Sequence, residues 1–306
     1  MEESSSLMAT RQEGGAVVFL VLMVLIGSST ATAAKFAVRE LPVGLLPLVR
    51  FGVAGLCLLP IVGRGGALAR MMRESGPRLV LAAALCVPIN QTLFLNGTRL
   101  APTTHVGLIY GTCPLVVLML AVALAQERLT RARLIGVLVT VAGAGVIAAE
   151  NLARSGPETA QALRGDLLLI GAVASWGAYL TVNKPLVVRY GSLTVLAGTF
   201  LVGAALDLPL AVWSVRDWSE IRNASPAAWW AMAHLALVVT VVGLSCQNQA
   251  LRRLDASQVA AVGNAAPLLT VLWGVWLLGE SVTPMLAVGG ALVLGGIVWT
   301  QRGGSE

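Results

Sequence analysis

The sequence predicts an all-α integral membrane protein of ten transmembrane helices, built as two inverted-topology five-helix repeats. Three observations support this fold class: the composition, the length of the apolar segments, and a similarity between the two halves of the chain. Of 306 residues, 57% are hydrophobic and 12% are charged, and the mean hydropathy is +0.81. Soluble domains carry about 25% charged residues. We therefore expect nearly the whole chain to lie in a lipid bilayer.

The apolar segments are long enough to span a membrane, because about 20 helical residues cross the hydrocarbon core. The first segment resembles a signal peptide, but Glu2, Glu3 and Glu13 precede it where a signal peptide carries basic residues. We expect it to remain as the first helix. Apolar segments bounded by charge, glycine or proline predict spans at 16–38, 43–61, 79–99, 103–125, 133–149, 166–186, 193–213, 228–250, 257–278 and 284–300.

The distribution of basic residues predicts the orientation of these spans. With the N-terminus in the cytoplasm, 13 of the 21 Lys and Arg residues lie on the inner side, seven on the outer side, and Arg50 lies within a helix. The positive-inside rule therefore favours an inner membrane location with both termini cytoplasmic. The net charge of +6 is spread over short connections, so we expect no nucleic-acid partner.

Residues 16–149 and 165–300 resemble each other, and we expect each range to form one repeat. The two lysines of the chain, Lys35 and Lys184, match at an offset of 149 residues. Five spans are an odd number, so the second repeat enters the membrane in the opposite direction, a plan common among secondary transporters. Further matches at offsets of 149 or 153 are Phe51/Phe200, Pro60/Pro209, Arg99/Arg252, Pro114/Pro267, Glu127/Glu280, Thr130/Thr283, Gly136/Gly289 and Gly143/Gly296.

Short motifs in both halves add a resemblance to a known family. In the first half they are residues 27–29 with Lys35, Arg50-Phe51, Pro114 and Gln126-Glu127-Arg128, and in the second half Ser175-Trp176-Gly177, Lys184, Asn264, Pro267, residues 277–280 and Gly289. Both halves resemble the EamA domains of the drug/metabolite transporter superfamily. The resemblance covers the chain from about residue 16 to residue 300 and implies a ten-helix, exporter-like permease. It also implies a central cavity lined by spans one, three, four, six and nine.

Polar and aromatic residues near mid-depth of those spans are the candidate substrate-binding residues. Aromatic rings supply apolar walls, and amides and hydroxyls supply a few orienting hydrogen bonds, as in many small-ligand sites. The alternative is that these groups only bond neighbouring helices. The set consists of Ser29, Asn90, Gln91, Tyr110, Trp176, Tyr179 and Asn264.

Ionisable residues inside spans are costly and therefore need a partner or a function. Arg50 and Asp207 lie at similar depths below the outer face, so we expect a buried ion pair with a structural or gating role, and a direct role in transport is the alternative. Lys35 and Lys184 lie near helix ends, where snorkelling to water is expected. Attraction of a substrate carboxylate at a cavity mouth is the alternative for these lysines.

Three other features have structural interpretations. Glu127 and Glu280 follow spans four and nine, where helix-end contacts are expected, and His105 is expected at an exposed helix end. Pro114 and Pro267, also assigned a structural or gating role, predict kinks within their helices. Gly136, Gly143, Gly289 and Gly296 predict close packing of spans five and ten, which holds the halves together or supports a homodimer.

These observations favour a secondary transporter over other classes of protein. The sequence shows no phosphate-binding glycine loop and no metal-ligand spacing, so we expect neither enzymatic activity nor a cofactor. Aromatic walls, amides and nearby positive charge suit an amino acid or a similar neutral or anionic metabolite. Protons are the candidate coupling ion, and facilitated diffusion is the alternative. The alternatives are a multidrug or other xenobiotic exporter and, of another class, a membrane-embedded sensor or enzyme.

Overall fold

The computed structural model describes residues 18–63, 66–123, 130–153, 157–253 and 265–302, and the regular structure in these ranges is helical throughout. Seven helical stretches are long and apolar enough to cross a membrane: Val18–Ala37, Leu45–Val62, Ala67–Leu100, Thr103–Leu120, Ala160–Tyr190, Ser192–Ser214 and Pro226–Gln249. Three shorter apolar helices cover Leu134–Gly143, Ala265–Leu278 and Pro284–Gly296. The chain is therefore an all-helical, multi-pass membrane protein, and the sequence prediction of that class is confirmed.

The helices follow one another along the chain with short connections. A helical stretch from Val18 leads into the first labelled helix. In the first half the elements are α2 (Thr30–Ala37), α3 (Leu45–Val62), α4 (Ala67–Ala84), η2 (Leu85–Ile89), α5 (Asn90–Leu100), α6 (Thr103–Gly111), α7 (Cys113–Ala123) and α8 (Arg131–Ala153). In the second half they are α9 (Pro157–Tyr190), α10 (Ser192–Ser214), α11 (Trp218–Asn223), α12 (Pro226–Ala233), η3 (His234–Gly243), α13 (Leu244–Arg253), α15 (Ala265–Leu278) and α16 (Pro284–Arg302).

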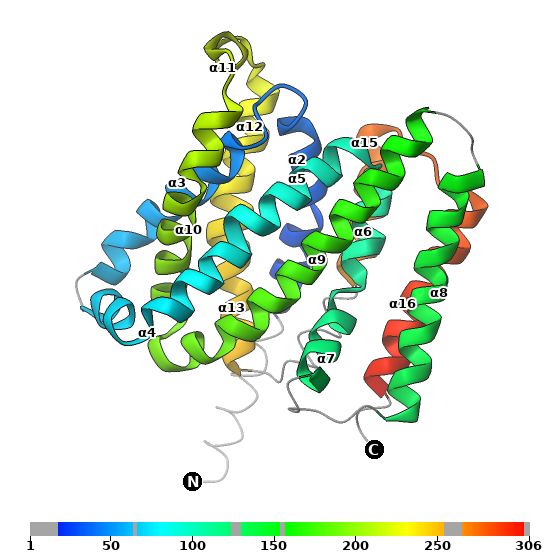
Figure 1. The fold of residues 1–306 in the computed structure, drawn as a ribbon, viewed down its shortest axis with the longest axis horizontal. Helices are drawn as coiled ribbons and strands as arrows, with labels where there is room; N and C mark the ends of the chain where they lie inside the picture. The colour runs from blue at the N-terminus through cyan, green and yellow to red at the C-terminus, as the bar shows by residue number, and fades with distance from the viewer. Residues whose placement is uncertain (1–17, 64–65, 124–129, 154–156, 254–264, 303–306) are drawn as a thin grey trace.

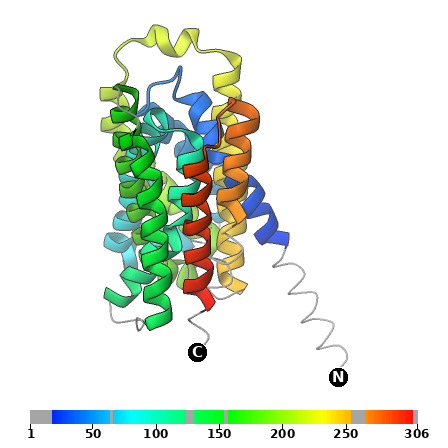
Figure 2. The same cartoon turned by 90° about the vertical axis from the view of Figure 1, so that its right-hand side faces the viewer.

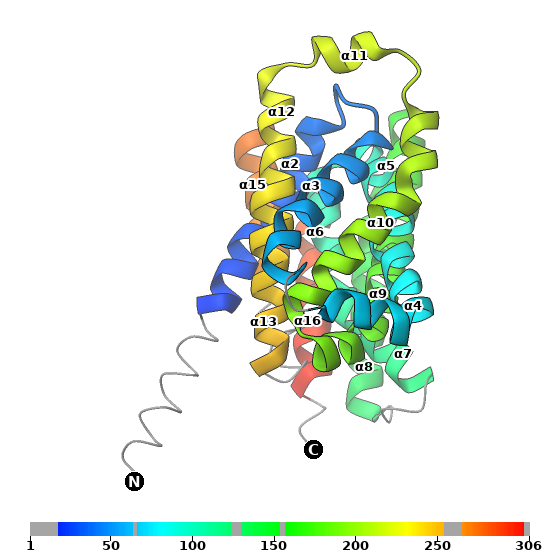
Figure 3. The ribbon, with the colours of Figure 1, turned by 90° about the vertical axis from the view of Figure 1, so that its left-hand side faces the viewer.

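The long helices form a bundle with two distinguishable ends. The short helix α11 lies across one end, which we call the α11 end (Figure 3). Helix α16 finishes at Arg302 at the other end, which we call the Arg302 end (Figure 2). Within the bundle, one buried apolar cluster includes Phe94 and Leu169, and a second includes Phe51 and Phe200. The interior is therefore assembled from helices far apart in the sequence.

Helices α8 and α16 stand side by side at one edge of the bundle (Figure 1). Glycine allows this close contact, because a Cβ atom added at Gly143 would lie 2.7 Å from the Gly289 carbonyl oxygen and 2.7 Å from the Val293 nitrogen. A Cβ at Gly296 would likewise lie 2.6 Å from the Gly136 carbonyl oxygen. The predicted packing of these glycine-bearing segments is confirmed.

Two π-helical segments interrupt the α-helical stretches. Segment η2 contains Pro88, which has no N–H group, and η3 extends from His234 to Gly243. Leu85 and His234, which begin the two segments, are 149 residues apart. In a π-helix the hydrogen bonds join residues five apart, and such segments frequently occur at functional sites.

The kinks predicted at Pro114 and Pro267 have different outcomes. The helical stretch that contains Pro114 is broken at Thr112, so Pro114 lies in the first turn of α7, where its missing N–H costs no helical bond. Pro267 is buried near the described start of α15, and the residues expected to precede it in a span, 257–264, lie outside the described ranges. One boundary was also wrong: residues 67–78, expected in a connection, belong to α4, which is distorted at Ser75 (φ −136°, ψ 23°) two residues before Pro77.

Replacing Gly143 by Leu should separate α8 from α16. Overpacking of this kind costs about 1–3 kcal/mol, so we expect the purified protein in detergent to unfold at a lower temperature than the wild type. Gly145→Leu is the matched control, because a Cβ at Gly145 meets no atom within 4 Å. Equal melting temperatures for the two variants would contradict the close contact.

Candidate functional site

A chain of buried polar side chains crosses the interior between α3, α5 and α6. Arg50 donates from Nη1 to Gln91 Oε1 at 3.2 Å, and Gln91 Nε2 donates to Asn90 Oδ1 at 2.8 Å. Asn90 Nδ2 in turn donates to the Ala172 carbonyl oxygen at 2.7 Å and to Tyr110 Oη at 3.4 Å. The structure therefore brings Asn90, Gln91 and Tyr110, three predicted site residues, into one network with Arg50.

Arg50 is held from a second side by the π-helical segment η3. Its Nε donates to Thr240 Oγ1 at 2.6 Å, and Thr240 Oγ1 donates to the Leu235 carbonyl oxygen at 2.7 Å. Arg50 is the sixth residue of α3, about 8 Å along the helix axis from its start. Two hydrogen bonds to neutral oxygens therefore fix the guanidinium plane within the bundle.

The suggested Arg50–Asp207 ion pair is not formed. Arg50 contacts Thr240 and Gln91, whereas both carboxylate oxygens of Asp207 are buried without a hydrogen-bond partner in the described part of the chain. Asp207 lies in α10, which packs along α3. Asp207 therefore lies against α3 without pairing with the Arg50 guanidinium.

Ser29 belongs to a different contact. Its Oγ lies 2.8 Å from His234 Nε2 and 2.7 Å from the Ile26 carbonyl oxygen, to which it donates. The neighbouring Ser28 accepts a hydrogen bond from Trp273 Nε1 at 3.1 Å. His234 and Thr240 did not belong to the predicted set, although a polar side chain inside a predicted span is a sufficient signal for a candidate.

The two aromatic candidates on α9 form a pair in the second apolar cluster. The rings of Trp176 and Tyr179 have centroids 5.0 Å apart with an interplanar angle of 45°. One residue before Trp176, Ser175 Oγ donates to the Leu85 carbonyl oxygen of η2 at 2.7 Å. This bond ties the aromatic pair to the segment that leads into Asn90. The remaining candidate, Asn264, lies outside the described residues.

The turn between α5 and α6 is held by two charged side chains at the α11 end. Pro102 favours an extended Ala101 (φ −99°, ψ 157°), which ends α5, and it has no N–H to offer the Thr98 carbonyl. Lys35 replaces that donor, because its Nζ lies 2.7 Å from the Thr98 oxygen and 2.6 Å from the Ala101 oxygen. Lys35 is half-buried, and its ammonium holds this turn, a contact that the expectation of snorkelling to water did not include.

Glu280 completes this turn from the opposite side. Its carboxylate accepts from the Thr103 nitrogen at 2.7 Å and from the Thr104 nitrogen at 2.8 Å, which are free donors in the first turn of α6. A cation at a helix C-terminus and an anion at a helix N-terminus both match the helix dipoles. The predicted helix-end contact is confirmed for Glu280, while Glu127 lies outside the described residues.

His105 is buried, contrary to the expectation of an exposed helix end. The His105 side chain is 8% exposed, and its Nδ1 lies 3.1 Å from Asp166 Oδ1 on α9. The backbones of α5 and α9 approach closely here, because a Cβ added at Gly165 would lie 2.7 Å from the Ala101 nitrogen. This approach places Asp166 beside the first turn of α6.

Outside the helices, a second connection joins two loops of the α11 end. The Ser225 nitrogen and hydroxyl donate to the Glu40 carboxylate at 2.6 and 2.8 Å. These two hydrogen bonds, the backbone one first, hold the pKa of the Glu40 carboxyl below its ordinary value. Because the pKa is depressed, this contact is present near neutral pH and is lost when acid protonates the carboxylate.

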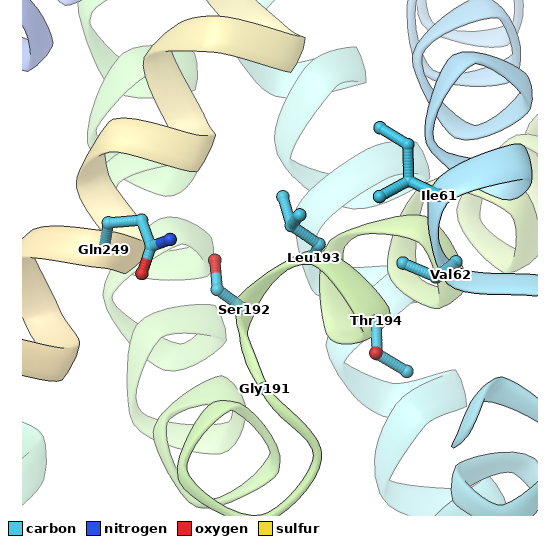
Figure 4. A pocket seen from close by; sticks show the side chains of 7 residues that line it. All are labelled: Ile61, Val62, Gly191, Ser192, Leu193, Thr194 and Gln249. Atoms are coloured by element: carbon cyan, nitrogen blue, oxygen red, sulfur yellow. The ribbon is translucent and has the colours of Figure 1, made fainter. Parts of the chain in front are cut away.

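The Arg302 end has its own polar cluster and a hollow. Arg189 Nη2 donates to Glu74 Oε2 at 2.7 Å, and Tyr190 Oη donates to the same oxygen at 3.0 Å, which links α9 to α4. The hollow, of about 330 Å³, is lined by uncharged residues and contains none of the predicted site residues. Figure 4 shows these lining residues, which are Ile61, Val62, Gly191, Ser192, Leu193, Thr194 and Gln249.

Apolar helices around a buried polar centre define a multi-pass membrane protein, and comparison with known proteins gives its family. The EamA-like transporter family matches the chain twice, over residues 14–149 and 163–301. The chain therefore belongs to the EamA-like transporter family, as the sequence motifs suggested. This family consists of transporters, so the expectation that the chain is not an enzyme is confirmed.

Individual relatives agree with this membership. The chain is 30% identical over 288 residues to a "Probable terminal-alkyne amino-acid exporter" of Streptantibioticus cattleyicolor, covering 94% of this chain and 93% of that protein. It is 22% identical to the "Uncharacterized transporter YyaM" of Bacillus subtilis, covering 91% and 92% of the two chains. A solved crystal structure with 22% identity superposes with a TM-score of 0.67 over 95% of this chain and 99% of that one, which shows the shared fold.

Replacing Glu280 by Ala should destabilise the α5–α6 turn. The change leaves the Thr103 and Thr104 amides without an acceptor, and an unsatisfied buried donor costs about 1–3 kcal/mol. We expect a lower melting temperature and faster hydrogen exchange at these two amides, measured by mass spectrometry. The exposed Glu220 in α11 gives the control, Glu220→Ala, which should change neither quantity; unchanged exchange in Glu280→Ala would contradict the assignment.

Proposed function

We propose that the chain is a secondary transporter that exports a small metabolite, an amino acid or a similar neutral or anionic solute, by alternating access. The 30% identical relative whose name describes an amino-acid exporter carries this proposal, because the similarity extends over nearly the full length of both proteins. The polar chain from Arg50 to Tyr110 adds support, since buried amides and a guanidinium are suited to a polar solute.

The proposed architecture is ten spans in two inverted repeats, residues 16–149 and 165–300. Its support comes from the family match in each half and from the interval of 149 residues between the starts of η2 and η3, which equals one of the sequence offsets. Two related halves provide two equivalent arrangements around a central site, as alternating access requires. The proposed bending points are the break at Thr112, two residues before Pro114, and the helix that contains Pro267.

The proposed substrate contacts are Asn90, Gln91 and Tyr110 in the polar chain, with Ser29, Trp176, Tyr179 and Asn264 around them. Two carboxamides offer donors and acceptors, and the Trp176–Tyr179 pair offers an apolar wall. Both termini are proposed to be cytoplasmic in the inner membrane, on the basis of the basic-residue distribution. Protons are the proposed coupling ion, and the functional unit is a monomer or a homodimer.

Flux in proteoliposomes tests the function. The purified protein is reconstituted, and uptake of a panel of radiolabelled L-amino acids and neutral metabolites is measured with and without an imposed pH gradient. We expect saturable flux of at least one amino acid, faster with the gradient. Saturable flux that ignores the gradient would exclude proton coupling, and absence of flux for every compound, from folded protein, would contradict the transporter proposal.

Replacing Trp176 by Ala should reduce that flux about tenfold or more, because the contact of a large aromatic side chain with a ligand contributes about 1.5 kcal/mol or more. Membrane expression should change little. Trp230→Ala is the matched control, since the Trp230 side chain is 76% exposed on the bundle surface. Normal flux through the Trp176 variant would remove Trp176 from the proposed substrate contacts.

A further inference from the structure

The charge of Arg50 is not neutralised by any carboxylate in the described ranges. Its hydrogen-bond partners are the Thr240 hydroxyl and the Gln91 amide oxygen, both neutral. Arg50 is 5% exposed and lies within a transmembrane helix, where an isolated charge is costly. A buried guanidinium that keeps its charge needs an anionic partner for at least part of the transport cycle.

The geometry leaves one side of the guanidinium free for such a partner. The Nε and Nη1 atoms have protein acceptors, whereas Nη2 has no acceptor among the residues that the structure describes. The guanidinium is also enclosed by the bundle, since Arg50 is 5% exposed, so bulk water does not supply its missing partner. The unused N–H groups can donate to an incoming ligand.

The orientation of this free edge is set by its neighbours. Gln91 is itself fixed by Asn90, and Thr240 is fixed by the Leu235 carbonyl oxygen. Held from two sides, the guanidinium plane cannot turn its free edge elsewhere without breaking a hydrogen bond. A planar guanidinium with neighbouring N–H donors matches a carboxylate, which it binds through two parallel hydrogen bonds.

The second half has no cation at the position that matches Arg50. The residue 149 positions after Arg50 is Thr199, a buried neutral side chain whose hydroxyl has no partner in the described structure. Asp207, the acid considered as a partner, does not bond to Arg50, so the guanidinium has no carboxylate partner from this residue. One cation favours a ligand with one carboxylate over a dianion.

We infer that Arg50 binds the carboxylate of the transported solute, so that the transporter accepts amino acids and related monocarboxylates and discriminates against their amides and amines. This inference rests on the proposed transport function and names the substrate group that its site recognises. Gln91 and Thr240 act as positioning residues that aim the guanidinium at the carboxylate.

Carboxylate recognition can be tested without altering the protein. We take each L-amino acid that stabilises the wild-type protein or is transported by it into proteoliposomes. Each is compared with its primary carboxamide, which keeps the amino group and side chain but lacks the carboxylate. We expect the amino acid to raise the melting temperature of the detergent-solubilised protein and to show flux at least about tenfold above the amide. Equal behaviour of acid and amide would overturn the inference.

Two variants then locate the recognition at Arg50. Arg50→Gln removes the charge, and Arg50→Lys keeps the charge but loses the planar pair of donors. We expect Arg50→Gln to lose the acid-over-amide preference and Arg50→Lys to retain only part of it. Arg222→Gln in the exposed helix α11 is the control and should behave as the wild type. An unchanged preference in Arg50→Gln would assign the recognition to another residue and overturn the inference.

The two assays separate failure of the inference from failure of the proposed function. Flux of amino acids and amides at equal rates would overturn carboxylate recognition while leaving transport intact. Thermal stabilisation by amino acids in the wild type but not in Arg50→Gln, with no flux of any compound, would support the carboxylate site and contradict transport. Neither stabilisation nor flux would overturn both. Because the acid and amide are first compared on the wild type, misfolding of a variant cannot hide the answer.

Discussion

Backbone N–H and C=O groups that are shielded from water need hydrogen-bond partners, and this need determines the structure at the α11 end of the bundle. The turn between α5 and α6 shows it most clearly. Pro102 deprives a carbonyl of its helical donor, and the following turn begins with free amides. Lys35 from α2 and Glu280 after α15 satisfy these groups. Four helices are thereby tied together at one point, and the direction in which α5 and α6 enter the interior is fixed.

The interior polar chain depends on that arrangement. Asn90 begins α5 and Tyr110 lies near the end of α6, so the relative placement of these helices sets the distance between the two side chains. From Asn90 the hydrogen bonds continue through Gln91 to Arg50, and each amide uses both its donor and its acceptor. Such a network is rigid because the loss of any one bond leaves a polar group unsatisfied in an apolar surrounding.

Much of this organisation could be predicted from the sequence, and the errors have a common cause. Hydropathy and the fixed rise of a helix give the depth of a residue, which is why Asn90 and Gln91 were correctly expected inside the bundle. Depth does not give rotation about the helix axis. Arg50 and Asp207 therefore looked like partners although they face different neighbours, and Lys35 looked free to reach water although a proline-broken helix end lies beside it.

The π-helical segment before Asn90 has a consequence for comparing members of the family. A π turn contains an additional residue, so the helix that follows is rotated by about 100° relative to an uninterrupted α-helix. Asn90 and Gln91 owe their inward direction to that rotation as well as to their position in the chain. A single-residue gap at 85–89 in an alignment would consequently mark a relative that presents different side chains to the interior at this level, rather than a neutral change of length.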